Sequence, residues 1–273
     1  MGYQDPIFII GSYRSGTSIT TWCLGQHPNI WLLPETYWIA QFARAVPDYF
    51  AHGTSQPAAH FERCGLTEED FQEAAQDFVH DVIRRGQERR VRKVLTNLQN
   101  GGEVNRTMWI QRAPKEPKRR WVDGTPENAH SVKELHALFP GARFIHLVRS
   151  PHEVVRSMAK FDTAGGDPQG ARDAYDTWRR LAGAAWEAEQ ELGSDVVRRF
   201  FQADLTERPE DMFRDMCRFI GEPYRPACLE PLQERINSSK VEDEDVPSKD
   251  NLPRKLHSVF DDNEDFFQAM KTQ

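Results

Sequence analysis

Two short apolar runs stand out along the chain, and a helix-like pattern follows each of them. Residues 7–10 form the first run and residues 144–148 the second. Neither run alternates regularly with polar residues, which is typical of strands buried on both faces of a parallel sheet. After each run, apolar residues recur three or four positions apart, as on one face of a helix. The pattern therefore predicts an α/β fold, a P-loop-like doubly wound sheet, mainly parallel, with helices on both faces.

Capping signals and further periodic segments extend this prediction. Ser-x-x-Glu capping boxes at 131–134 and 150–153 predict two helix starts, the second with Pro151 at the first helical position. Residues 196–201 are interpreted as another strand, and residues 209–220 as a helix that ends at Gly221. Strands and helices thus continue to alternate through most of the chain.

The chain is expected to form one domain over residues 1–273. Residues 36–121 contain amphipathic helical patterns and two clusters of basic residues, and are interpreted as a helical insertion or lid on the acceptor side. The basic clusters are either solvated faces or a rim that attracts an acidic acceptor. Residues 241–273 show no apolar periodicity and are interpreted as an acidic C-terminal tail.

Composition and charge narrow the classes of protein. The 273 residues contain 35 Lys and Arg against 42 Asp and Glu, a net charge of −7, which disfavours binding of nucleic acid through bulk positive charge. No apolar stretch approaches the roughly 18 residues of a membrane-spanning helix, and the start lacks a signal-peptide pattern. The four cysteines form no CxxC pair, which disfavours a zinc site. We expect a cytoplasmic protein without a bound metal; the pattern does not indicate its oligomeric state.

A glycine-rich segment joins the first apolar run to its helix. Gly11 and Gly16 have the GxxxxG spacing of a phosphate-binding loop, in which main-chain N–H groups and a helix N-terminus bind phosphate oxygens. Thr17 stands where triphosphate-binding loops have lysine, and no strand ending in Asp is evident to hold Mg²⁺. Arg14 would instead hold a smaller anion without a metal. The predicted anion-binding residues of this loop are Arg14, Ser15, Gly16, Thr17 and Ser18.

A second anion site is predicted after the second apolar run. Arg149 leaves the carboxyl end of that strand, the edge at which open α/β sheets bind their ligands. Ser157 lies six residues beyond Pro151, about 9 Å along a helix. Arg149 and Ser157 could therefore converge on one dianion, unless Ser157 is a small packing residue and Arg149 forms a salt bridge at the sheet edge. Two phosphate sites on one molecule indicate a nucleotide bisphosphate.

Four collinear segments resemble sulfotransferases that use 3′-phosphoadenosine-5′-phosphosulfate, in particular their bacterial and tyrosylprotein branches. The loop at 13–18 resembles the 5′-phosphosulfate loop, and residues 144–158 resemble the 3′-phosphate motif. Residues 121–128 and 203–221 are similar to further landmarks of the family. The resemblance implies a hydroxyl-bearing acceptor, such as a small molecule, glycan or peptide, and adenosine 3′,5′-bisphosphate as the nucleotide product.

The resemblance also implies a catalytic glutamate, and one cation is missing. The residue that matches the general base is Glu35, which lies 21 positions after Arg14. Arg14 would act on the transferring group. We expect Glu35 beside Trp31, Tyr37 or Trp38, where burial would raise its pKa; it could otherwise only cap a helix. His27 is a weaker candidate for the base. Several relatives carry a lysine where this chain has Gly124, so either Arg14 suffices, or another cation such as Lys115 replaces it, or the chain has reduced activity.

Two other functions stay open from the sequence. A P-loop small-molecule kinase is disfavoured by Thr17 at the lysine position. A non-catalytic protein that binds a nucleotide bisphosphate is favoured only by Gly124. Aromatic residues of the insertion, among them Trp38, Phe42 and Phe50, would either line an acceptor pocket or form a local core.

Overall fold

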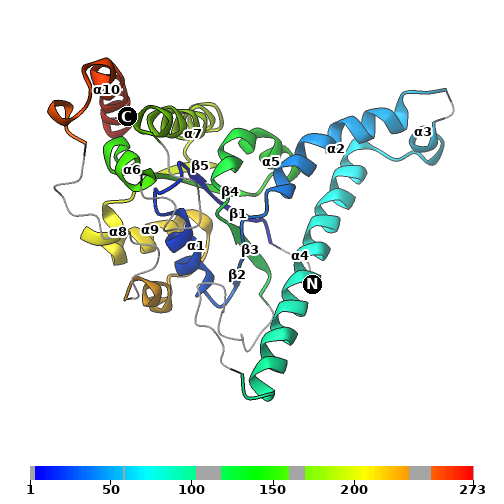
Figure 1. Cartoon of the computed structure of the whole chain (residues 1–273). Helices are drawn as coiled ribbons and strands as arrows, with labels where there is room; N and C mark the ends of the chain where they lie inside the picture. The colour runs from blue at the N-terminus through cyan, green and yellow to red at the C-terminus, as the bar shows by residue number, and fades with distance from the viewer. Residues whose placement is uncertain (1–3, 58, 103–117, 160–169, 234–246, 273) are drawn as a thin grey trace.

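The computed structural model describes residues 4–57, 59–102, 118–159, 170–233 and 247–272. Five parallel strands form one sheet in the order β2-β3-β1-β4-β5 (Figure 1). The strands are β1 (Ile7–Gly11), β2 (Ile30–Leu32), β3 (Arg120–Asp123), β4 (Arg143–Val148) and β5 (Val197–Phe201). The helices are α1 (Thr17–Gly25), α2 (Trp38–Thr54), α3 (His60–Cys64), α4 (Glu68–Gln99), α5 (Val132–Leu138), α6 (Pro151–Met158), α7 (Ala171–Leu192), α8 (Asp204–Glu207), α9 (Pro209–Ile220) and α10 (His257–Thr272), with 3₁₀ segments that include η1 (Pro126–Ser131) and η3 (Pro226–Gln233).

Strand β1 lies at the centre of the sheet and is buried on both faces. Ile7 and Ile9 pack with α1 and α9 on one face, whereas Phe8 and Ile10 pack with α5 and α7 on the other. Alternate side chains of a strand point to opposite faces, so an unbroken apolar run is what a two-sided layer requires. The predicted fold, a mainly parallel α/β sheet covered on both faces, is confirmed.

The two strands that precede the predicted anion sites are neighbours. Strands β1 and β4 pair in register from Ile7 with Arg143 to Gly11 with Leu147, so both strands end at the same edge. Gly11 has a φ of 138°, and a Cβ atom there would lie 2.3 Å from the carbonyl oxygen of Leu147. Only glycine permits this close approach, which turns the chain into the loop.

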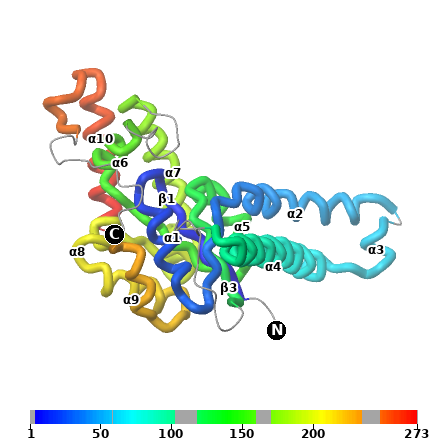
Figure 2. The backbone as a smooth tube through the Cα atoms, turned by 60° about the horizontal axis from the view of Figure 1, so that its bottom comes forward, coloured from blue at the N-terminus to red at the C-terminus, as the bar shows by residue number. Residues whose placement is uncertain are grey.

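The helical insertion forms a hairpin that projects from the sheet. Helices α2 and α4 run side by side and are joined by α3 at the far end (Figure 2). Helix α4 begins with a capping box between Thr67 and Asp70. The expected range of 36–121 extends too far, because Arg120 and Trp121 belong to β3, where both are buried. Part of the second basic cluster, with Lys115 and Arg112, lies outside the described residues.

Part of the C-terminal segment is a helix rather than an acidic tail. Residues 257–272 form helix α10, which buries Asn263, Phe267 and Met270 against the body of the protein. Its acidic residues obscured the apolar periodicity in the sequence. The first part of the expected tail, 241–246, lies outside the described residues.

The two predicted capping boxes are wrong. Neither Ser131 nor Ser150 makes a side-chain cap to its helix, and the Ser131 hydroxyl is buried. Helix α5 follows directly on η1, so its first turn continues an existing helical segment. Pro151 does occupy the first turn of α6, as predicted. In the described part of the chain, every helix is too short or too polar to pass through a lipid bilayer.

Candidate functional site

The loop between β1 and α1 has the backbone of an anion-binding turn. Arg14 and Gly16 both have positive φ values, 62° and 91°. Gly16 is the residue before α1 and has no side chain. The N–H groups of the first turn of α1, from Thr17 onward, therefore receive no hydrogen bond from a capping side chain. Unpaired N–H groups at a helix N-terminus attract anions. Ser15 is fully buried in this loop, and its hydroxyl has no partner among the described residues.

Arg14, Arg149 and Ser157 come together although they are far apart in the sequence. The Arg14 Nε donates to the Ser157 hydroxyl at 2.9 Å, and the Arg149 Nη1 donates to the Arg14 carbonyl oxygen at 3.0 Å. Burial lowers the pKa of Arg14, and the charge of Arg149 lowers it further. The acidic side chain paired with Arg149 is Glu153, at 3.5 Å. The positive charges of Arg14 and Arg149 at this edge favour the binding of an anion. The site prediction placed these residues together, and their roles in binding stay predictions.

Glu35 lies next to a cluster of acidic and tyrosine side chains. The Tyr37 hydroxyl donates to its carboxylate, as the expectation of a neighbouring aromatic residue required. Burial by surrounding atoms raises the pKa of Glu35, and the negative charges of Glu127 and Asp123 raise it further, although the residue as a whole remains exposed. A carboxylate with a raised pKa is a better proton acceptor for a hydroxyl. The geometry is therefore suitable for a general base; the role itself is untested.

Asp123 fixes the loop that carries Glu35. This fully buried carboxylate accepts hydrogen bonds from the Thr36 hydroxyl at 2.7 Å, from the Thr125 N–H and hydroxyl at 3.0 and 2.6 Å, and from Asn128 at 2.9 Å. Thr125 also accepts from the Thr36 N–H at 2.8 Å. Burial raises the pKa of Asp123, and the hydrogen bonds oppose that rise. The end of β3 thus holds Thr36 and, through it, Glu35.

Tyr13 is a site residue that sequence reasoning missed. Its hydroxyl donates to Glu127, which lies in η1, and burial together with Glu127 raises the pKa of Tyr13. The negative charge of Glu35 also acts on Tyr13, so the phosphate loop and the acidic cluster are adjacent. Tyr13 precedes Arg14 inside the loop, and that position was the available signal.

Gly124, the position where the resemblance implies a lysine in several members of the family, is enclosed. A Cβ atom at this position would lie 2.1 Å from the Thr21 hydroxyl, which donates to the Thr17 carbonyl oxygen at 2.7 Å. A lysine therefore requires Thr21 to move. Lys118 does not supply the missing cation, because its ammonium group is buried against three carbonyl oxygens at the end of α1 and the start of β2. The proposed substitute, Lys115, lies outside the described residues.

His27, the weaker candidate for the base, has a structural environment. It is buried, its Nε2 lies 2.9 Å from the Pro223 carbonyl oxygen, and its Nδ1 accepts from the Asn29 N–H at 3.2 Å. Burial lowers the pKa of His27. Both ring nitrogens are used within the protein, so His27 joins the end of α1 to the segment after α9.

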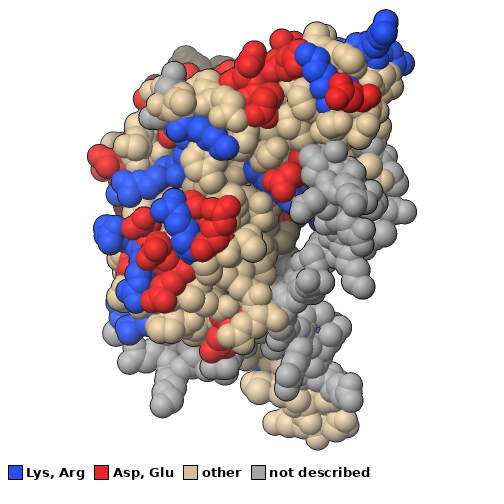
Figure 3. All heavy atoms as spheres, turned by 90° about the vertical axis from the view of Figure 1, so that its left-hand side faces the viewer, with Lys and Arg blue, Asp and Glu red and all other residues tan. Residues whose placement is uncertain are grey.

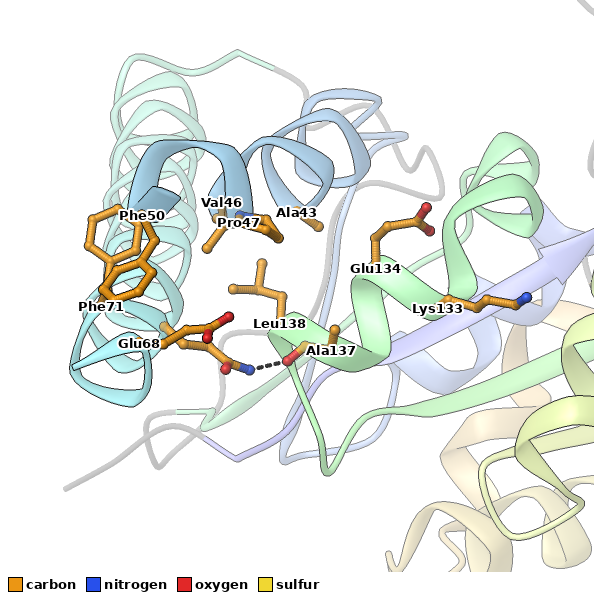
Figure 4. Close-up of a pocket in the computed structure, with 11 residues that line it drawn as sticks. Ala43, Val46, Pro47, Phe50, Glu68, Phe71, Lys133, Glu134, Ala137 and Leu138 are labelled. Carbon is orange, nitrogen blue, oxygen red and sulfur yellow. Dashed lines mark hydrogen bonds between the residues drawn. The ribbon is translucent and has the colours of Figure 1, made fainter. Parts of the chain in front are cut away.

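The aromatic residues of the helical hairpin mostly pack on one another. Phe50, Phe61 and Phe71 form a cluster with ring centroids 5.2–5.9 Å apart. Phe50 and Phe71 also line an apolar pocket of about 280 Å³ between α2, α4 and α5 (Figure 4). Its lining includes no residue of the phosphate loop or of the segment 149–157. The interpretation as a local core is favoured for these rings.

Basic side chains at the start of the first cluster on α4 and on the body of the protein are mixed with acidic ones. On α4, Arg84 pairs with Asp81 and Glu88. Figure 3 shows Lys and Arg interleaved with Asp and Glu on the face where α8 and α9 lie, and Arg208 pairs there with Asp204. Mixed charges of this kind give little net attraction for an extended polyanion. Among the described residues, no three potential metal-ligating side chains are grouped to hold a metal ion.

Comparison with known proteins identifies the family. The sequence profile described as "Sulfotransferase family" matches residues 6–226, well over half of the chain. The chain belongs to the sulfotransferase family. This membership supports sulfuryl transfer as the class of reaction. The matched residues include the loop, the segment 149–157 and the acidic cluster.

Individual relatives are distant. The chain is 23% identical to a protein-tyrosine sulfotransferase of Drosophila melanogaster, over 82% of this chain and 39% of the relative. It is 25% identical to protein-tyrosine sulfotransferase 1 of Danio rerio, over 82% of this chain and 55% of the relative. The chain thus spans about half the length of these relatives or less.

Solved structures support the fold. The sulfotransferase domain of the Synechococcus PCC 7002 olefin synthase superposes with a TM-score of 0.51 at 20% identity, over 97% of this chain and 89% of that domain. The sulfotransferase domain from the curacin biosynthetic pathway also gives 0.51, at 19% identity, over 86% of this chain and 78% of that domain. At this identity the likeness concerns the fold alone.

Proposed function

We propose that the protein transfers a sulfuryl group from 3′-phosphoadenosine-5′-phosphosulfate to a hydroxyl group. The observation that supports this proposal is the convergence of Arg14, Arg149 and Ser157 at the shared edge of β1 and β4. The loop at 12–18 would bind the 5′-phosphosulfate, and Arg149 with Ser157 would bind the 3′-phosphate. Arg14 donates to Ser157, so the two anion sites would be adjacent at this edge, which suits a nucleotide that carries phosphate at both ends of its ribose.

The reaction is an in-line displacement at sulfur. The acceptor oxygen forms a bond to sulfur while the bond from sulfur to the donor's phosphate oxygen breaks, and the acceptor proton passes to the Glu35 carboxylate. The products are a sulfate ester and adenosine 3′,5′-bisphosphate. Arg14 and the N–H groups of the loop would stabilise the charge on the leaving phosphate, which requires no metal ion. General-base catalysis by Glu35 would contribute about 10²- to 10⁴-fold in rate.

Calorimetry with adenosine 3′,5′-bisphosphate in buffer containing EDTA tests the binding site directly. We expect binding by the wild type and a loss of at least tenfold in affinity for Arg14→Ala. Arg218→Ala is the matched control, because Arg218 is an exposed arginine of α9 paired with Asp215. Tighter binding of ATP with Mg²⁺ than of the bisphosphate would contradict the proposal and favour a kinase.

Transfer of labelled sulfate tests catalysis. Because two of the relatives described above are named protein-tyrosine sulfotransferases, the first acceptors to screen are tyrosine-containing peptides, followed by phenols and glycans. We expect transfer by the wild type and a loss of about 10²-fold or more for Glu35→Gln with binding of the bisphosphate retained. Binding without transfer to any acceptor would favour the non-catalytic alternative, which Gly124 supports.

A further inference from the structure

The second residue of helix α6 is held by the C-terminal helix. His152 is buried, and its Nε2 lies 2.8 Å from the Glu264 carboxylate of α10, while its Nδ1 lies 2.7 Å from the Tyr175 hydroxyl of α7. Because a carboxylate only accepts, Nε2 carries the proton and the Tyr175 hydroxyl donates to Nδ1. The Phe260 ring of α10 stacks on the imidazole at 3.8 Å with an interplanar angle of 13°. Both ring nitrogens and one face of the imidazole are thus in contact with residues of α7 or α10.

A second contact connects α10 to Arg149. The Trp178 Nε1 donates to the carbonyl oxygen of Arg149 at 3.0 Å. The Trp178 ring in turn packs edge-on against Phe266 and Phe267 of α10, with centroids 6.0 and 6.5 Å apart. The main chain at Arg149 and the first turn of α6 are therefore both supported from α10.

Helix α10 is itself anchored to the body. Arg199 of β5 donates to the Met270 carbonyl oxygen, and Arg179 of α7 donates to the Asp262 carbonyl oxygen at 3.2 Å and lies over the Phe266 ring. These anchors lie in the middle of the helix and near its C-terminal end. The match to the family profile ends at residue 226, before α10.

We propose that α10 is a clamp that positions Arg149 and Ser157 and so sets the preference of the site for a nucleotide with a 3′-phosphate. This inference rests on the proposed function. Ser157 lies five residues after His152, about 7.5 Å further along the same short helix, so a tilt of α6 at His152 displaces the Ser157 hydroxyl. His152 and Glu264 are positioning residues, since neither is expected to contact the nucleotide.

The test compares binding of adenosine 3′,5′-bisphosphate with binding of adenosine 5′-monophosphate, which lacks the 3′-phosphate. We expect the wild type to prefer the bisphosphate and Glu264→Ala to lose about tenfold of that preference, as for one hydrogen bond to a charged group. Glu264→Gln should restore it, because the amide oxygen still accepts from His152. Asp265→Ala is the control, since Asp265 is exposed on the same helix. In the transfer assay, Glu264→Ala should raise KM for the donor and leave kcat within about twofold.

The outcomes separate the clamp from the function on which it rests. A wild type that binds both nucleotides equally would overturn the two-phosphate site itself. If the wild type prefers the bisphosphate and Glu264→Ala keeps the same preference, only the clamp is overturned. An equal loss of affinity for both nucleotides in Glu264→Ala would also overturn the clamp alone. If Glu264→Ala does not fold, as judged by thermal unfolding, Tyr175→Phe removes one hydrogen bond from the same ring and should lower the preference in the same direction.

Discussion

Replacing Asp123 by alanine should strongly destabilise the protein. The change removes the acceptor of four hydrogen bonds: three buried ones from Thr125 and Asn128 and a partly buried one from Thr36. Each buried donor left without a partner costs about 1–3 kcal/mol, and relief from burying the carboxylate offsets part of the sum. We therefore expect a net loss of about 3–5 kcal/mol, below the simple sum over the donors that lose their acceptor.

Asparagine at the same position is the matched control. Its carbonyl oxygen can keep both bonds from Thr125, and its NH₂ group then faces Thr36 and Asn128. The Thr36 hydroxyl can rotate to accept, and the Asn128 amide can flip, because its own Oδ1 is buried without a partner among the described residues. Asp123→Asn should therefore cost less than about 1.5 kcal/mol, near the value of a single hydrogen bond.

Thermal unfolding by calorimetry distinguishes these two variants. At about 2–4 °C per kcal/mol for a domain of this size, Asp123→Ala should lower Tm by roughly 10 °C and Asp123→Asn by only about 3 °C. Equal losses for both variants, or a loss below about 1 kcal/mol for alanine, would refute the reasoning that the four hydrogen bonds determine the stability of this corner.

Three further predictions concern other parts of the molecule. Burial lowers the pKa of Lys118 to about 7, yet only its ammonium form can donate to all three carbonyl oxygens; Lys118→Met should cost about 3 kcal/mol in denaturant unfolding. Burial lowers the pKa of His146, so the unfolded chain takes up its proton first as pH falls below about 6.5; stability should drop between pH 7 and 5, and less steeply in His146→Leu. Gly124→Ala should lower the free energy of unfolding by about 1–3 kcal/mol, as measured by thermal unfolding. Adding Thr21→Ala to this variant should restore part of that stability.

Strands β1, β4 and β5 could be predicted from the sequence, whereas the two short strands β2 and β3 were missed. Strand β1 is apolar up to Gly11, and β4 is apolar from Phe144 to Val148 except for the buried His146. Strand β3 is only four residues long and has Arg120 and Asp123 at its ends, so its sequence resembles the end of a helical segment; the expectation that no strand ends in Asp was therefore wrong. Arg120 is buried there because its guanidinium donates to main-chain carbonyl oxygens, a tertiary arrangement that leaves no local signal.

The candidate site was predictable where it follows from topology. Arg14 and Arg149 follow adjacent parallel strands, and such strands end at one edge, so spacing alone placed the two residues together. The bond between Tyr13 and Glu127 joins residues 114 positions apart, and it depends on how η1 packs rather than on any motif. The contact of Glu264 with His152 was equally hidden, since α10 had been interpreted as an acidic tail.

The pairing of β1 with β4 fixes the distance between the two loops of the proposed nucleotide site. Adjacent strands lie about 4.8 Å apart, and the two loops cannot drift from each other without breaking main-chain ladders in the middle of the molecule. The hairpin of α2 and α4, in contrast, projects away from the sheet (Figure 2). Its length and composition can therefore vary without a change in the central strands. An engineer seeking new acceptors should therefore edit that hairpin and leave the central strand ends untouched.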